Sequence, residues 1–132
     1  QTIFKKSKIL QKRVKWLGDL SDVQYKKLLN HAEFLWHAGQ IDNGTFSVIE
    51  AAFSGIPSLS SDYPAMREID KQFSLNLAWM DPNSARNMAE QLKTMEQTAM
   101  IRRSLLPNEA QLYAQNTENY AHTYWQELRS CL

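Results

Sequence analysis

Short apolar runs alternate along this chain with longer stretches in which apolar residues recur every three or four positions. The runs are five or six residues long and are bounded by turn residues, so we expect strands there and not helices. They are Arg13–Leu17, Phe34–Ala38, Ile56–Ser60 and Leu75–Met80. Their starts are spaced by about twenty residues, which is typical of βα units and predicts a mostly parallel sheet with helices on both faces.

The stretches between and after these runs contain helix-start and helix-stop signals. Ser21-Asp22 and Pro64 are start signals, and Gly55 marks a C-terminal stop. The expected helices begin at Ser21-Asp22, cover Thr45–Ser54, run from Pro64 to about Ile69, cover Ser84–Met95, and then continue through Leu112 and over Tyr120–Leu128. The predicted fold class is α/β, a Rossmann-like parallel sheet flanked by helices, in which ligands bind at the carboxyl ends of the strands.

Length and composition narrow the class of protein. With 132 residues the chain is long enough for one core, and we expect residues 1–132 to form a single domain. A net charge of +1 gives no argument for nucleic-acid binding. The single cysteine, Cys131, cannot form an internal disulfide, and no run approaches the roughly 20 apolar residues of a membrane span, so a cytoplasmic location is expected. Because the chain starts at Gln1, we expect it to be a piece of a larger protein.

The stretch from Asp42 to Glu50 (DNGTFSVIE) combines an acid at each end with a glycine-containing turn and the start of a predicted helix. The first amides of a helix have no partners within it and lie at the positive end of its dipole, so they form an anion site that suits phosphate. Gly44 has no Cβ and lets the backbone approach a ligand closely. A tight turn followed by an N-cap at Thr45 explains the same residues without a ligand, and spacing alone leaves both interpretations open.

Glu50 stands among apolar neighbours, so the sequence predicts that it is buried and needs a partner. The neighbours are Val48, Ile49, Ala51, Ala52 and Phe53. At about one and a half helical turns from the phosphate site, its carboxylate could accept both hydroxyls of a ribose. Asp42 could hold hydroxyls of a sugar beyond the phosphates. A salt bridge of Glu50 inside the core is the alternative.

The segment FLWHAGQIDNGTFSVIEAAFSGIPSLSSDYPAMREI resembles the donor-site motif of glycosyltransferase family 4, whose members are retaining enzymes with the GT-B fold. The likeness extends over about residues 13 to 100 and includes LGDLSD and YKKLL upstream. It implies that Asp42 is the first acid, which contacts the donor sugar, and that Glu50 is the second, which binds the nucleotide ribose. By the same resemblance, the amides that bind the diphosphate belong to Gly44, Thr45, Phe46 and Ser47.

The resemblance also implies a function and partners. The chain is then the C-terminal, donor-binding half of a two-domain enzyme that transfers a hexose from a GDP- or UDP-sugar with retention. Asp42 and Glu50 are its catalytic residues, and no metal or other cofactor takes part. The acceptor, a saccharide or a lipid-linked sugar bound through an N-terminal domain, would belong to surface polysaccharide or lipopolysaccharide synthesis. Without that domain, the chain is expected to bind donor weakly and to be inactive.

Some positions depart from the family pattern. The first acid is Asp42 where Glu is usual, Ala38-Gly39 replaces Pro-Ser, and Asn43-Gly44-Thr45 replaces Gly-Phe-Gly. The phosphate-clamping Arg and Lys of the family, which lie upstream of the motif, are not found in this sequence. These departures leave a second hypothesis open, a non-catalytic α/β module that binds a nucleotide sugar or serves in interactions.

Three polar features near the predicted strand ends have two interpretations each. In the turn Ser60–Tyr63, Ser61 could line the nucleotide pocket, or the turn could be a helix N-cap cluster. His37, at the end of a predicted strand, could face the pocket or pair with the backbone. Glu68 matches a family position after the turn, but a salt bridge with Arg67 or a lysine is the simpler explanation.

The two ends of the chain present apolar residues in an amphipathic pattern. The first fifteen residues contain no acid, and their basic residues are Lys5, Lys6, Lys8, Lys12, Arg13 and Lys15. This pattern fits contact with anionic lipid head groups at the cytoplasmic membrane face, or simply a solvated helix face. The last predicted helix has apolar residues on roughly one side, at Tyr120, Tyr124, Trp125 and Leu128. They could pack on the domain's own sheet, or form an open patch that favours dimerisation.

Overall fold

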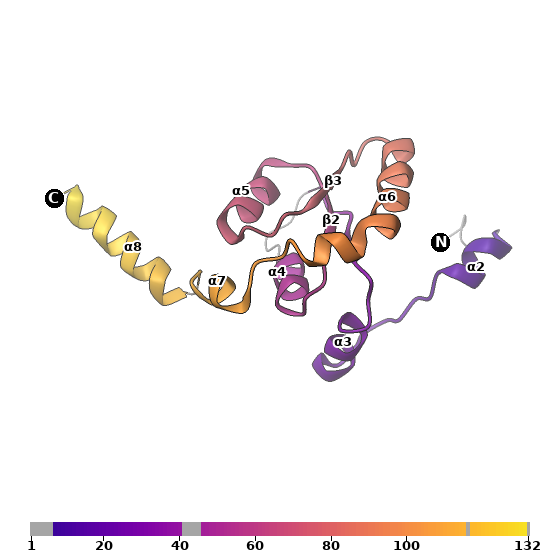
Figure 1. Cartoon of the computed structure of the whole chain (residues 1–132), viewed down its shortest axis with the longest axis horizontal. Helices are drawn as coiled ribbons and strands as arrows, with labels where there is room; N and C mark the ends of the chain where they lie inside the picture. The colour runs from indigo at the N-terminus through magenta and orange to yellow at the C-terminus, as the bar shows by residue number, and fades with distance from the viewer. Residues whose placement is uncertain (1–6, 41–45, 116, 132) are drawn as a thin grey trace.

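A parallel sheet forms the centre of the computed structural model (Figure 1). The described residues are 7–40, 46–115 and 117–131. Within them the strands are β1 (Leu35–His37), β2 (Ser58–Ser61) and β3 (Ala78–Met80). The order is β1-β2-β3, and both pairs are parallel, with Trp36 opposite Leu59 and Ser60 opposite Trp79. The predicted α/β class and the parallel sheet are therefore confirmed.

The prediction of a strand at Arg13–Leu17 is wrong. A short helix, α2 (Lys8–Arg13), ends there, and Val14 continues with extended dihedral angles of φ −112° and ψ 124°. No described strand pairs with this segment, and Trp16 within it is 75% exposed. A β-branched and aromatic composition does not suffice to form a strand. An extended segment becomes part of a sheet only when a neighbouring strand forms hydrogen bonds with its backbone groups.

Helices begin within one residue of the predicted starts at Ser21-Asp22, Pro64 and Ser84, whereas the last helix begins at Thr117, before the predicted Tyr120. They are α3 (Asp22–Leu29), α4 (Phe46–Phe53), α5 (Pro64–Phe73), α6 (Ala85–Arg103), α7 (Glu109–Tyr113) and α8 (Thr117–Ser130). Ser21 caps α3 and forms a capping box with Gln24, and Ser84 caps α6. The chain leaves α4 through Gly55, whose φ of 69° is unfavourable for residues with a Cβ. Both α5 and α6 run further than predicted.

Helices cover both faces of the sheet, as the periodicity predicts (Figure 1). On one face, α4 and α5 pack against alternate strand residues, and the buried cluster there is Val48, Ala52, Met66, Leu75, Leu77 and Leu112. On the opposite face, α6 packs against Leu59, Ala78 and Met80 through Met95. A third cluster joins α3 to α4 through Leu29 and Ala51. These clusters fix the ends of the strands relative to α3, α4 and α5.

The last helix does not pack on the sheet. Figure 1 shows α8 (Thr117–Ser130) extending away from the strands. Tyr124, Trp125 and Leu128 are 70%, 59% and 54% exposed. The interpretation of this helix as part of the domain's own core is therefore wrong, while dimerisation stays a prediction. None of the described helices has the length and apolar character needed to cross a membrane.

Candidate functional site

The region in which the sequence places the ligand begins where β1 ends and α4 starts. Of the residues predicted there, Asp42, Gly44 and Thr45 lie outside the described residues. Phe46 and Ser47 form the first turn of α4, where Phe46 is 69% exposed and Ser47 is half-buried. The amides of this turn lie where an anion site is expected. Diphosphate binding at this helix start stays a prediction.

Glu50 lies on the outer side of α4, and the prediction that it is buried is wrong. Only one side of the helix faces the core, because its buried residues Val48, Ala51 and Ala52 recur at the spacing of a single helix face. Glu50 and Phe53 lie on the exposed side. The carboxylate therefore stays in contact with water, and the α4 sequence does not require a salt bridge in the core.

The partner of Glu50 is Tyr25, a residue 25 positions earlier in the chain. The Tyr25 hydroxyl donates a hydrogen bond of 3.1 Å to Oε2 of Glu50 and so links α3 to α4. Burial raises the pKa of Tyr25 above its ordinary value, and the hydrogen bond to Glu50 and the negative charge of Glu50 raise it further. The sequence analysis did not identify this pair, because a contact between residues 25 positions apart leaves no local pattern.

A cavity of about 510 Å³ lies between α3 and α4, beside this hydrogen bond. Its lining residues are Asp22, Tyr25, Lys26, Leu29, Asn30, Glu50, Phe53 and Ser54. The volume falls within the roughly 300–1,000 Å³ that is typical of small-ligand sites. Apolar and polar side chains contribute together, so the cavity offers both a contact surface and hydrogen-bonding groups to a ligand.

The carboxyl end of β2 places Ser61 in the core. Ser61 is fully buried, and its hydroxyl has no hydrogen-bond partner among the described residues. The turn is not an N-cap cluster, since Tyr63 is the N-cap of α5 and makes no side-chain cap hydrogen bond. The neighbouring Ser60 hydroxyl lies 3.2 Å from Nδ1 of His37, so this ring nitrogen has a side-chain partner. Contact of Ser61 with a nucleotide stays a prediction.

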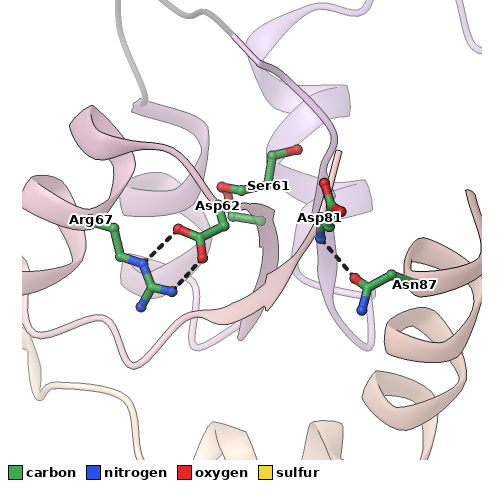
Figure 2. A network of polar contacts seen from close by, with 6 residues as sticks. Ser61, Asp62, Arg67, Asp81 and Asn87 are labelled. Carbon is green, nitrogen blue, oxygen red and sulfur yellow. Dashed lines mark hydrogen bonds and ion pairs between the residues drawn. The ribbon is translucent and has the colours of Figure 1, made fainter. Parts of the chain in front are cut away.

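Asp62 is the first residue after β2, and it is paired with Arg67 of α5. Figure 2 shows its carboxylate turned toward Arg67, which donates two hydrogen bonds of 2.8 and 2.6 Å. These hydrogen bonds hold the pKa of Asp62 below its ordinary value. The guanidinium also lies 3.9 Å from the ring centroid of Trp79. Arg67, one of the partners considered for Glu68, therefore pairs with Asp62 instead.

The residues that follow β3 form hydrogen bonds at the same edge of the sheet. The amide of Asp81 donates to the side-chain oxygen of Asn87 at 2.8 Å (Figure 2), and Oδ1 of Asp81 accepts from the amide of Asn83 at 2.8 Å. Gln40, which follows β1, donates to the Asn83 side chain at 3.2 Å. In the described part of the chain, no three His, Cys, Asp or Glu side chains are grouped so that they could hold a metal ion.

Comparison with known proteins identifies the family. The family described as "Glycosyl transferases group 1" matches residues 4–113. This stretch contains the donor-site segment and the βα unit before it, so the resemblance noted from the sequence is confirmed. The parallel sheet flanked by helices agrees with a Rossmann-like C-terminal half of a GT-B fold. No curated protein and no solved structure matches the chain.

Proposed function

The chain belongs to the group 1 glycosyl transferases, and from this premise we propose that it binds a GDP- or UDP-sugar for transfer of a hexose with retention. One observation supports the site above the others: the exposed Glu50 carboxylate lies beside the cavity between α3 and α4. Glu50 follows Phe46 by four residues, which is about 6 Å along the axis of α4. A nucleotide with its phosphates at the helix start would therefore bring its ribose near Glu50.

Each part of the donor has a candidate partner in this proposal. The amides of Phe46 and Ser47, with those of Gly44 and Thr45, bind the diphosphate, and Glu50 accepts hydrogen bonds from the ribose hydroxyls. Asp42 contacts the transferred hexose, and Ser61 contributes its hydroxyl near the phosphates. The leaving diphosphate gains negative charge during transfer, and the fixed dipole of α4 stabilises that charge without a metal ion.

The acceptor is a saccharide or a lipid-linked sugar, used in surface polysaccharide synthesis at the cytoplasmic membrane face. Support for membrane contact comes from the segment around α2. Ile9 and Trp16 are each 75% exposed there, and basic residues lie between and beside them. The basic residues are Lys8, Lys12, Arg13 and Lys15. Such a segment binds anionic head groups through its charges and buries its apolar side chains at the interface.

Calorimetric titration with GDP, UDP and their sugar conjugates tests the proposal. We expect saturable binding of one nucleotide by the wild-type chain, and a Kd for Glu50→Ala that is higher by about ten- to hundredfold, because hydrogen bonds to a charged group are lost. Glu127→Ala, which removes an exposed glutamate of α8, is the matched control and should bind like the wild type. Repeating the titration with vesicles of phosphatidylserine or phosphatidylcholine tests the membrane contact.

The outcomes separate the hypotheses. Unchanged affinity in Glu50→Ala would exclude Glu50 from the site, and absence of binding to every nucleotide would contradict the proposal for this chain. Binding without sugar transfer by the full-length protein would favour the non-catalytic module. Transfer is measured by NMR of the anomeric proton in the product, which also reports retention or inversion.

A further inference from the structure

The link between α3 and α4 consists of a side-chain hydrogen bond and a small core. Tyr25 Oη donates to Glu50 Oε2 at 3.1 Å, while Leu29 of α3 packs with Ala51 and Ile56 beneath it. Glu50 is exposed, and a free glutamate at such a position would exchange between several rotamers. The hydroxyl of Tyr25 removes part of this freedom before any ligand arrives.

Tyr25 can perform this task because its own position is well determined. The capping box of Ser21 and Gln24 fixes the first turn of α3, and the amide of Tyr25 donates to Ser21 O at 2.9 Å. The Tyr25 ring is half-buried and packs against the cluster formed by Leu29 and its neighbours. A tyrosine has two side-chain torsions, so packing of the ring places the hydroxyl within narrow limits.

The hydrogen bond also leaves Glu50 able to bind. A carboxylate has about four lone-pair positions on two oxygens, and the single proton of a phenol occupies one of them. The donor is neutral, so the carboxylate keeps its negative charge. Both side chains line the cavity of about 510 Å³ between α3 and α4. The second oxygen is then available to a diol that enters this cavity.

From these contacts we propose that Tyr25 is a positioning residue for the donor nucleotide: its hydroxyl holds the Glu50 carboxylate in the orientation that accepts the ribose 2′- and 3′-hydroxyls. This inference rests on the proposed function above, in which Glu50 binds the ribose. It adds that ribose binding also requires Tyr25 of α3, a residue that itself makes no contact with the ribose. Affinity for ribonucleotides then depends on the hydroxyl of Tyr25, whereas affinity for nucleotides without ribose hydroxyls does not.

Tyr25→Phe tests the inference, because it removes the hydroxyl and keeps the ring in the core. The probes are the nucleoside diphosphate that the wild type binds and its 2′,3′-dideoxy analogue. We expect Kd for the ribonucleotide to rise about three- to tenfold, the effect of one neutral hydrogen bond, and Kd for the dideoxy analogue to stay unchanged. Tyr124→Phe, which changes an exposed tyrosine of α8, is the control for loss of a phenolic hydroxyl.

Three outcomes would overturn the inference. Equal weakening of both nucleotides by Tyr25→Phe would indicate general damage to the site, and no weakening of either would show that Glu50 needs no positioning. A further loss from Tyr25→Phe in the Glu50→Ala background, which has no side-chain acceptor at position 50, would show that Tyr25 acts independently of Glu50. The proposed function fails in a different way: the wild type then binds no nucleotide, or binds the ribonucleotide and the dideoxy analogue equally, and the inference fails with it.

Discussion

Glu50 and Asp62 are both exposed carboxylates on βα units of the same sheet, yet their partners differ. Glu50 accepts one hydrogen bond of 3.1 Å from the neutral hydroxyl of Tyr25. Asp62 accepts two, of 2.8 and 2.6 Å, from the guanidinium of Arg67. Arg67 in turn stacks on Trp79, which holds the cation in place. One carboxylate therefore keeps its charge and an open oxygen, while the other has both oxygens occupied by a cation.

This difference leaves Glu50 with more free acceptor capacity than Asp62. A bidentate arginine matches the geometry of a carboxylate and cancels its charge, so little attraction is left for a ligand. A single phenol restricts the orientation of a carboxylate and leaves most of its acceptor capacity free. Asp62 thus fixes the turn between β2 and α5, whereas the proposed function assigns to Glu50 the binding of hydroxyl groups in the cavity between α3 and α4.

The largest effect is expected from removing the core that supports both carboxylates. Met66 is fully buried and packs in one cluster with Val48 and Ala52 of α4, and it precedes Arg67 in α5. Met66→Ala should lower the free energy of unfolding by about 2–5 kcal/mol, because it creates a cavity in that cluster. Urea unfolding followed by circular dichroism measures the change.

The control for this prediction is Met100→Ala, because Met100 is 87% exposed. It should change the free energy of unfolding by no more than about 0.5 kcal/mol. Similar losses of unfolding free energy in the two variants would show that Met66 does not belong to a core shared by α4 and α5.

A smaller effect should appear when Asp62 loses its charge. The folded-state pKa of Asp62 lies below its ordinary value of 3.8, so the ion pair stabilises the fold above that pH and is lost as the pH falls through the lowered pKa. Asp62→Asn should therefore be less stable than the wild type at neutral pH, and the difference should close in acid. Urea unfolding between pH 2 and 7 measures it, with Glu127→Gln as an exposed control. A difference that stays constant with pH would contradict the ion pair.

The elements that could be predicted from the sequence depend on local patterns. The apolar runs that became β1, β2 and β3 lie between turn residues, and the helix starts follow from residues such as Ser21, Pro64 and Ser84. The segment Arg13–Leu17 has the same local composition as a strand, yet the structure gives it no neighbour. Pairing is a non-local property, and composition cannot supply it.

The candidate site could be predicted only as far as its residue types. The sequence identified Glu50 as an acid that needs a partner, but its apolar neighbours suggested burial, because periodicity alone did not show that α4 has an outer face. The partner itself, Tyr25, comes from another helix. Similarly, Arg67 pairs with Asp62, five residues before it and across the start of α5, while the adjacent Glu68 stays exposed. Helix direction and side-chain geometry decide these pairs, and neither follows from sequence spacing.

The smallest expected effect is a change in the pKa of Tyr25, and it measures the contrast between the two carboxylates most directly. The pKa of Tyr25 is raised first by burial and then by Glu50, so Glu50→Gln should lower it only part of the way toward its ordinary value of 10.0. NMR titration of the tyrosine ring signals between pH 8 and 12 measures this, with Tyr25→Phe identifying the signal. Because the folded-state pKa is raised, the corresponding stabilisation is present below pH 10.0 and is lost as the pH rises through the folded-state value. An unchanged pKa in Glu50→Gln would show that the Tyr25 hydroxyl does not lie beside the charge of Glu50 in solution, and would contradict the positioning of Glu50 by Tyr25.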